Sequence, residues 1–330
     1  MPKISVIMSV YNTAEYLREA IESILNQTFT DFEFIIVNDC STDKSEEIIN
    51  SYHDRRIIYI KNEKNMGRAA TPNRGLKICR GEFVARQDSD DISFPNRLKT
   101  EYDFLKKHPL IDICGSWIKI IGTDKIWKVP TRPELISPLL LFGIQIFHPT
   151  IMWRAESFKR LNLSYDSTLR ESEDYDLLSR AAKFLKMANI KKILLDYRTD
   201  NNKTNKFLNS SESQAIVNSI RKRSVNELIV KTSPEEDKIH QKISNGQVEN
   251  DDELDCAEKW LIKLVVANDE KKLYAIRGFR EVMRQQWLTI VLRNKKTPKF
   301  KLLINSPIFG SDFLQRIINL IILAIKIKLS

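Results

Sequence analysis

The sequence has little cysteine and no recognisable export signal. Its cysteines are Cys40, Cys79, Cys114 and Cys256. They lie far apart and form no Cys-x-x-Cys pair, so we expect neither a disulfide framework nor a zinc site, and a reducing compartment such as the cytoplasm. The apolar run at residues 4–8 is too short for a signal peptide and lacks a small-residue cleavage site. We therefore expect a cytoplasmic protein.

Outside its C-terminal part, the chain also has no excess of basic residues. The net charge is +10, and residues 257–330 contain 15 Lys and Arg against 5 Asp and Glu. The rest of the chain is therefore close to neutral. A nucleic-acid-binding protein gathers its cations around a binding groove, and no such module is recognisable here, so we expect no nucleic acid partner.

Short apolar strands and helices alternate in the N-terminal part. The patterns predict strands at residues 4–9, 32–37, 57–60 and 82–86, and helices at residues 14–26 and 68–79. Repeated strand–helix units with apolar strands are typical of a parallel sheet with helices on both faces. The predicted fold class is therefore α/β.

The later part of the chain is less regular. We expect a helix from Pro95 to Lys107 and a strand region at residues 111–121. The polar stretch at residues 201–213 predicts a mobile loop, the polar and acidic stretch at 232–254 predicts a linker or long loop, and residues 254–292 predict helix.

Polar residues follow three of the predicted strands. Tyr11 and Asn12 follow the first strand, Asp39 follows the second, and Asp88 and Asp90 follow the fourth. Ligands of parallel sheets bind beyond the carboxyl ends of the strands. We therefore expect these side chains to converge on one crevice.

Asp88, Asp90 and Asp91 form a carboxylate cluster with Ser89 between them. A hard divalent cation held by few carboxylates neutralises a leaving diphosphate and keeps positions open for its oxygens. We expect Asp90 to bind the metal, Asp88 to face the ribose or a metal-bound water, and Asp91 to brace the turn. The alternative interpretation of this triplet is a solvated acidic turn.

Asp39 and Tyr11 have both a functional and a structural interpretation. A carboxylate at position 39 can accept the N3–H of a uracil, or it can stabilise the N-terminus of the following helix. Tyr11 can stack on a base, or it can pack in the turn.

Four acids crowd into residues 171–176 at the start of a predicted helix. Their mutual repulsion should raise at least one pKa toward the range of a general base, for which Glu173 and Asp174 are the candidates. Such a base takes the proton of an acceptor hydroxyl. The alternative is an acid-rich first helical turn.

Together these segments resemble the inverting family 2 glycosyltransferases of the GT-A fold. The resemblance covers about residues 3–200 and rests on residues 5–12, 27–29, 37–43, 65–67, 73–76, 85–91 and 172–177, in that order. It implies a catalytic domain at residues 1–230, with a nucleotide-binding half at about 1–91 and an acceptor half at about 92–230. A helical C-terminal region at residues 231–330 would follow.

The resemblance also implies a chemistry and a set of site residues. A sugar would pass from a UDP-sugar to a hydroxyl of a glycan or glycolipid, with Mn²⁺ or Mg²⁺ as cofactor. The catalytic residues would be Asp174 and Glu173, and the metal ligands Asp90 and Asp88. The nucleotide-sugar-binding residues would be Ser9, Tyr11, Asn12, Asp39, Asn65, Arg68, Arg86, Asp88 and Ser89.

A narrower resemblance, to bacterial lipooligosaccharide N-acetylhexosaminyltransferases, lies in residues 125–132, 148–152 and 197–198. It implies UDP-GlcNAc or UDP-GalNAc as the donor and a terminal galactose of a lipid-anchored glycan as the acceptor. UDP-Glc, UDP-Gal or a dTDP-sugar remains an alternative donor.

The sequence departs from the family pattern at three positions. Ser9 replaces a common Pro, and Cys40 replaces a common Gly, so the turn at Cys40 must avoid a positive φ or accept strain. Pro72 stands where one branch has an Arg that faces the donor, a role that Arg86 can take. His148 is a candidate for contact with the acceptor or the metal, against a structural hydrogen-bonding role.

The C-terminal residues 313–329 are apolar with interspersed cations, but their uninterrupted apolar run covers only residues 320–325. A membrane-spanning helix needs roughly 18 apolar residues. We expect residues 293–330 to lie on the inner membrane surface, or else to pack on protein.

Two other classes of protein were considered. A nucleotidyltransferase needs a Gly-rich, basic loop after the first strand, and residues 11–15 are not one. A non-catalytic nucleotide-sugar-binding protein would not need acids at both the metal and the base positions.

Overall fold

The computed structural model describes residues 1–199, 210–293 and 306–309. The chain divides into two compact units. The first unit comprises Met1–Ile136 and Ile144–Ile220, and the second comprises Ser137–Gly143 and Arg221–Ser330.

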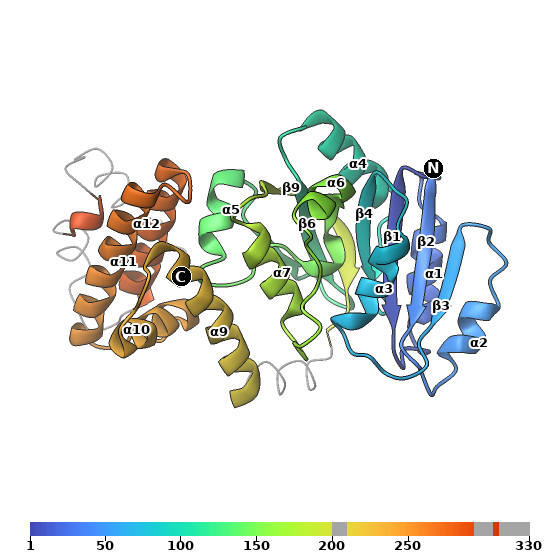
Figure 1. Ribbon diagram of the computed structural model, residues 1–330, viewed down its shortest axis with the longest axis horizontal. Coiled ribbons are helices and arrows are strands. Elements are labelled where there is room, and N and C mark those ends of the chain that lie inside the picture. The colour runs from blue at the N-terminus through green and yellow to red at the C-terminus, as the bar shows by residue number, and fades with distance from the viewer. Residues whose placement is uncertain (200–209, 294–305, 310–330) are drawn as a thin grey trace. The chain divides into compact units, whose positions relative to one another are not determined.

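The first unit is built on one mixed sheet (Figure 1). Its strands follow the order β3-β2-β1-β4-β8-β6-β9-β5, with β7 paired to β6. β1, β2, β3 and β4 are mutually parallel, as are β6 and β9, whereas β8 runs antiparallel to both β4 and β6. The strands are β1 Ile4–Val10, β2 Phe32–Asn38, β3 Ile57–Lys61, β4 Phe83–Asp88, β5 Ile92–Ser93, β6 Ile113–Ile120, β7 Ile126–Trp127, β8 Met152–Arg154 and β9 Met187–Tyr197.

Helices cover this sheet, and the predicted α/β class is confirmed. β1 and β2 are buried along nearly their whole length, which requires apolar residues on both faces. Gly75 lies where α3 approaches β1, and a Cβ there would come within 2.9 Å of the Ile7 side chain. The helices and short turns of this unit are α1 Leu17–Leu25, α2 Ser45–Asn50, α3 Ala70–Ile78, α4 Arg97–Lys107, η1 His148–Thr150, α6 Ala155–Arg160 and α7 Glu173–Ala181.

Two helices span positions where the chain passes between the units. They are α5 Pro133–Leu139 and α9 Ser211–Leu228. The described part of the second unit is helical. Its elements are α10 Pro234–Asn245, α11 Asp251–Lys271, α12 Ile276–Arg293 and η2 Pro307–Phe309.

The predicted linker at residues 232–254 is wrong, because α10 occupies most of it. Ser233 and Glu236 form a reciprocal capping box at its start, and Gly246 ends it in the left-handed conformation. Ile239 and Ile243, one turn apart, are buried. The capping signals and this spacing outweigh the polar composition.

Two other predictions are changed or lie outside the described residues. The predicted helix at 254–292 is divided, because Lys272 adopts φ 54° and ends α11. Residues 211–213 of the predicted loop begin α9, whereas 200–209 are not described. The apolar segment 313–329 also lies outside the described residues, so its membrane contact stays a prediction.

Among the residues that the structure describes, no helix has the length and apolar character of a membrane span.

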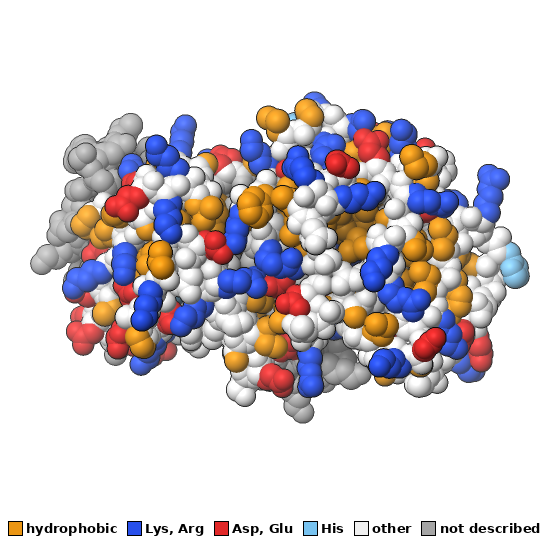
Figure 2. Space-filling view, viewed as in Figure 1, with side chains coloured by type: hydrophobic (Ala, Val, Ile, Leu, Met, Phe, Trp, Pro, Cys, Tyr) orange, Lys and Arg blue, Asp and Glu red, His pale blue; other side chains and the backbone are white. Residues whose placement is uncertain are grey.

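On the visible surface of α10, α11 and α12, basic side chains are interspersed with acidic ones (Figure 2). Ion pairs such as Lys263–Glu236 and Arg280–Asp269 account for part of this mixture.

Candidate active site

The carboxyl ends of β1, β2 and β4 meet at one edge of the sheet. Val10 lies opposite Asn38, and Ser9 lies opposite Asp88. The turns after these strands therefore begin side by side. The convergence of their side chains on one crevice stays a prediction.

Asp39 is buried and organises a loop. Its Oδ1 accepts hydrogen bonds from the Asn62 amide side chain at 2.6 Å and from the Met66 backbone N–H at 2.8 Å. Its Oδ2 accepts from the Gly67 N–H at 2.9 Å. A carboxylate offers about four acceptor positions. Asp39 thus holds residues 62–67 beside the strand end and keeps capacity for a ligand donor.

Two left-handed residues shape the neighbouring turns. Asn12 has φ 51°, and its Oδ1 accepts from the Thr42 N–H at 2.8 Å, while its own N–H donates to the Ser41 hydroxyl. Cys40 has φ 61°, so this turn accepts the strain that a side chain brings to a glycine-like position. Asn12 therefore ties the turn after β1 to the turn after β2.

The carboxylates of the cluster have different surroundings. Asp88 Oδ1 lies 3.0 Å from Arg86 Nη2. Burial opposes ionisation of Asp88, but Arg86 and more distant groups outweigh it and lower its pKa. Burial and the charge of Asp88 raise the pKa of Asp90 to about 6. Asp91 Oδ1 accepts from the Arg198 N–H at 2.9 Å, so Asp91 braces the turn.

Arg86 is only 4% exposed. Its Nη1 donates to the Ile7 carbonyl at 3.1 Å and its Nη2 to Asp88. In this arrangement Arg86 acts on Asp88, and a direct contact with a donor stays a proposal.

Asp88 and Asp90 are the carboxylates available to a metal ion. Among the residues that the structure describes, no three His, Cys, Asp or Glu side chains are grouped to hold one. A hard cation at this turn would therefore take further ligands from water and phosphate oxygens. The raised pKa of Asp90 fits such a site, because a cation would relieve its repulsion with Asp88.

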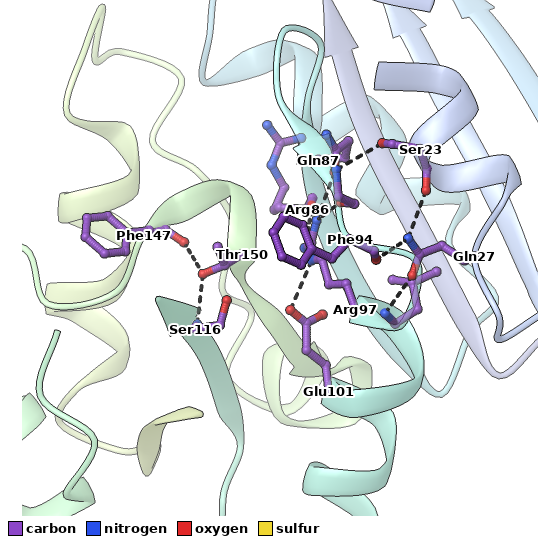
Figure 3. A network of polar contacts seen from close by, with 12 residues as sticks. Ser23, Gln27, Arg86, Gln87, Phe94, Arg97, Glu101, Ser116, Phe147 and Thr150 are labelled. Carbon is purple, nitrogen blue, oxygen red and sulfur yellow. Dashed lines mark hydrogen bonds and ion pairs between the residues drawn. The ribbon is translucent and has the colours of Figure 1, made fainter. Parts of the chain in front are cut away.

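A buried polar network lies beneath the carboxylate turn (Figure 3). Gln87 Nε2 donates to the carbonyls of Asp88 at 3.0 Å and Asp91 at 2.8 Å. Gln87 Oε1 accepts from Ser93 Oγ at 2.6 Å and Arg97 Nη1 at 2.9 Å. Buried side chains of this network therefore fix the shape of the turn.

Arg97 joins this network to helix α4. Its Nη2 donates to the Arg86 carbonyl at 2.6 Å, and its Nε donates to Glu101 Oε1 at 3.0 Å. Arg97 and Glu101 are both fully buried. Gln27, which follows the end of α1, supports the same segment, because its Oε1 accepts from the Leu98 N–H at 2.9 Å.

Arg198 holds the turn from the other side. Its Nε donates to the Asp90 carbonyl at 2.9 Å, and its Nη2 pairs with Glu19 at 2.8 Å. The guanidinium also lies 4.0 Å from the ring centre of Tyr16. Arg198 therefore fixes the end of β9 against both the carboxylate turn and α1.

The acids at the start of α7 form a second group. Ser172 adopts φ 56°, and the helix begins at Glu173. Glu173 is buried, and its Oε1 lies 3.5 Å from Arg68 Nε. Burial and the charge of Glu173 raise the pKa of Asp174 to about 6. Asp174 thus has the protonation behaviour expected of a general base.

His148 is neutral near pH 7, because burial and Arg86 lower its pKa to about 3. Its Nε2 lies 2.7 Å from the Tyr165 hydroxyl. Asp88 is close enough to act on His148 electrostatically. A neutral imidazole oriented by a second group is the form in which His binds metals.

The remaining predicted residues differ in exposure. Tyr11 is 47% exposed, and Asn65 is exposed too. Ser89 Oγ accepts from Thr13 Oγ1 at 3.0 Å. Among the described residues, no group lies within hydrogen-bonding distance of the buried Ser9 hydroxyl, which is beside Asp88 in the register.

Sequence reasoning missed Gln87, Arg97, Tyr165 and Arg198 as contributors to the site. One signal was available: Arg97 and Glu101 are oppositely charged and four apart on a helix, on the same face as the apolar Leu105. Arg198 belongs to a segment of the narrower resemblance, but no local pattern indicates its contact with Asp90, which lies 108 positions earlier.

Comparisons with known proteins identify the family of this chain. A model of the family described as glycosyl transferase family 2 matches residues 5–176. An uncharacterised glycosyltransferase of Methanocaldococcus jannaschii is 40% identical over 210 residues, which are 61% of this chain and 72% of that protein. The putative glycosyltransferase EpsE of Bacillus subtilis is 37% identical over 185 residues, 54% of this chain and 66% of that protein.

Among solved structures, S. aureus TarS 1–349 in complex with UDP-GlcNAc matches with a TM-score of 0.56 and 20% identity. The match covers 86% of this chain and 91% of that one. This likeness supports the GT-A fold. The chain belongs to glycosyl transferase family 2.

Proposed function

We propose that the protein transfers GlcNAc or GalNAc from UDP to a hydroxyl of a glycan or glycolipid, with inversion and with Mn²⁺ or Mg²⁺. The observation that carries this proposal is the meeting of Asp39, Asp88 and Asp90 at one sheet edge. The complex of TarS with UDP-GlcNAc supports the choice of donor.

In this proposal the residues 1–91 bind the nucleotide and the residues 92–230 bind the acceptor. Asp39 accepts the uracil N3–H, and Tyr11 stacks on the base. Asp90 and Asp88 hold the divalent ion, which would neutralise the charge of the leaving diphosphate. Ser9, Asn12, Asn65, Arg68, Arg86 and Ser89 line the donor side, and His148 lies between the metal side and the acceptor.

Asp174 acts as the base, with Glu173 raising its pKa. It takes the proton of the acceptor hydroxyl while that oxygen forms a bond to the anomeric carbon. The bond from this carbon to the diphosphate oxygen breaks on the opposite face, and UDP leaves with the bonding electrons. One displacement inverts the anomeric configuration.

Turnover of donors tests this proposal directly. We expect slow release of UDP from UDP-GlcNAc or UDP-GalNAc with Mn²⁺, and a fall of about 100-fold or more in EDTA. UDP-Glc, UDP-Gal and dTDP-Glc serve as the comparison donors. If the protein binds and hydrolyses no nucleotide sugar, the proposed function is refuted. Equal rates with and without EDTA would refute only the requirement for a metal ion.

Asp39→Asn should weaken UDP binding by about 10- to 100-fold, since a hydrogen bond to a charged group contributes about 1.5–3 kcal/mol. CDP should be affected far less, because cytosine has no N3–H to donate. Titration calorimetry with both nucleotides measures the ratio of their affinities. Glu63→Gln, which removes an exposed charge from the same loop, is the matched control. An equal loss for UDP and CDP would show that Asp39 acts only through the loop.

A further inference from the structure

Three aromatic side chains from separate segments meet beside the carboxylate turn. Trp127 lies on β7, Phe147 precedes η1, and Tyr197 ends β9. The ring centre of Trp127 lies 6.2 Å from that of Phe147 and 6.1 Å from that of Tyr197. We call these three side chains the aromatic platform.

The strand register explains why the rings share one face. Trp127 lies opposite Ile118, and Tyr197 lies opposite Ile120. Residues 118 and 120 are two apart on one strand, so their side chains point to the same side of the sheet. Ile118, Ile120 and Leu195 form a buried cluster against which Phe147 and Tyr197 pack. The platform therefore rests on a closely packed base.

Hydrogen bonds also fix the backbone that carries Phe147. The Thr150 hydroxyl donates to the Phe147 carbonyl at 2.8 Å and accepts from the Ser116 N–H at 3.1 Å (Figure 3). These bonds couple Phe147 to β6, the strand with which β7 pairs. The rings are thus held before any ligand arrives, which lowers the entropic cost of binding.

The platform adjoins the catalytic carboxylates. Tyr197 immediately precedes Arg198, whose N–H binds Asp91. Burial is the main cause of the raised pKa of the Tyr197 phenol, and the negative charges of Asp91, Asp88 and Asp90 raise it further. Phe147 immediately precedes His148, which interacts electrostatically with Asp88. A group seated on the rings would lie next to the reacting centre.

Exposure of the platform indicates a ligand with both apolar and polar surface. Trp127 is 45% exposed although it is a large aromatic side chain. Exposed Lys125 and Lys128 lie on either side of β7 in sequence. A pyranose ring presents C–H groups on its face, which suit the electron-rich face of an aromatic ring, and hydroxyls at its edge.

We propose that Trp127, Phe147 and Tyr197 form the subsite for the terminal pyranose ring of the acceptor. The inference rests on the proposed glycosyltransferase function and adds the residues that bind the second substrate. Trp127 is the most exposed of the three, so it is the residue to change.

Saturation-transfer NMR with a panel of methyl hexopyranosides tests this subsite in the full-length protein saturated with UDP and Mn²⁺. The panel contains the methyl glycosides of glucose, galactose and their N-acetylamino forms. We expect binding of at least one glycoside, and a loss of about tenfold or more in its affinity in Trp127→Ala. Trp127→Phe should recover part of the affinity.

Ile126→Ala is the matched control, because Ile126 is 40% exposed on the same two-residue strand and points to the other side of it. It should leave glycoside affinity unchanged. Equal glycoside affinity in wild type and Trp127→Ala would overturn the subsite, as would binding of no glycoside by a protein that binds UDP. Failure of the wild type to bind UDP would instead refute the proposed function, so the two failures are distinguishable.

Discussion

Replacing Asp174 with Asn should lower kcat for sugar transfer by about 10²- to 10⁴-fold, the usual contribution of a general base. The amide is nearly isosteric with the carboxyl group but cannot take the acceptor proton. Asp174 Oδ1 also accepts the Tyr175 N–H at 2.7 Å, a bond that the Asn oxygen can retain. The affinity for UDP, measured by calorimetry, should therefore stay within about threefold of the wild type.

The pH profile gives an independent check on this residue. Burial and then Glu173 raise the pKa of Asp174 to about 6. A base works in its ionised form, so kcat/KM should fall about tenfold per pH unit below about 6 and level off above it. Glu173→Gln removes the like charge and should move this rise to lower pH. An unmoved rise, or a near-normal rate in Asp174→Asn, would assign the base to another group.

Replacing Arg97 with Met should lower the free energy of unfolding by about 3–5 kcal/mol, because it leaves Glu101 buried without its partner and removes one donor from the Gln87 side-chain oxygen. Burial already raises the pKa of Glu101 to about 7 despite Arg97. The pair is therefore costly to bury, and its value lies in the shape that it gives the carboxylate turn. Denaturant unfolding monitored by circular dichroism measures the loss.

Lys99→Met on the same helix is the control, since Lys99 pairs with Asp103 at 2.7 Å in an exposed setting. It should cost less than about 1 kcal/mol. Arg97→Met combined with Glu101→Met should recover part of the stability, because apolar side chains can replace a buried ion pair. Equal stabilities of Arg97→Met and Lys99→Met would show that the buried network is unimportant.

The fold class and the place of the candidate site could be predicted from the sequence, because apolar residues recur at regular spacings in alternating strands and helices. Asp39, Asp88 and Asp90 follow apolar strands directly, and parallel pairing brings their turns together. No periodic pattern in the sequence indicates which donor sugar or acceptor the protein uses.

The supporting residues could not be predicted in the same way. Gln87 lies within a strand and donates hydrogen bonds to backbone carbonyls one and four residues later. In the sequence it looks like any other polar residue of a strand. Arg198 meets Asp90 only after the whole sheet has formed. In the second unit, α10 was missed because composition was given more weight than its capping residues.

Strand β8 is three residues long, and it alone stands between β4 and β6 in the strand order. The registers that align Asn38 and Asp88 with β1 lie on one side of it, and the strands that carry Trp127 and Tyr197 lie on the other. Besides β8, strand β5 and Arg198 tie the end of β9 to the carboxylate turn, whereas β7, which carries Trp127, pairs with β6. In the proposed function, a change at Trp127 would therefore alter the choice of acceptor while the strands that carry Asp39 and Asp88 keep their register.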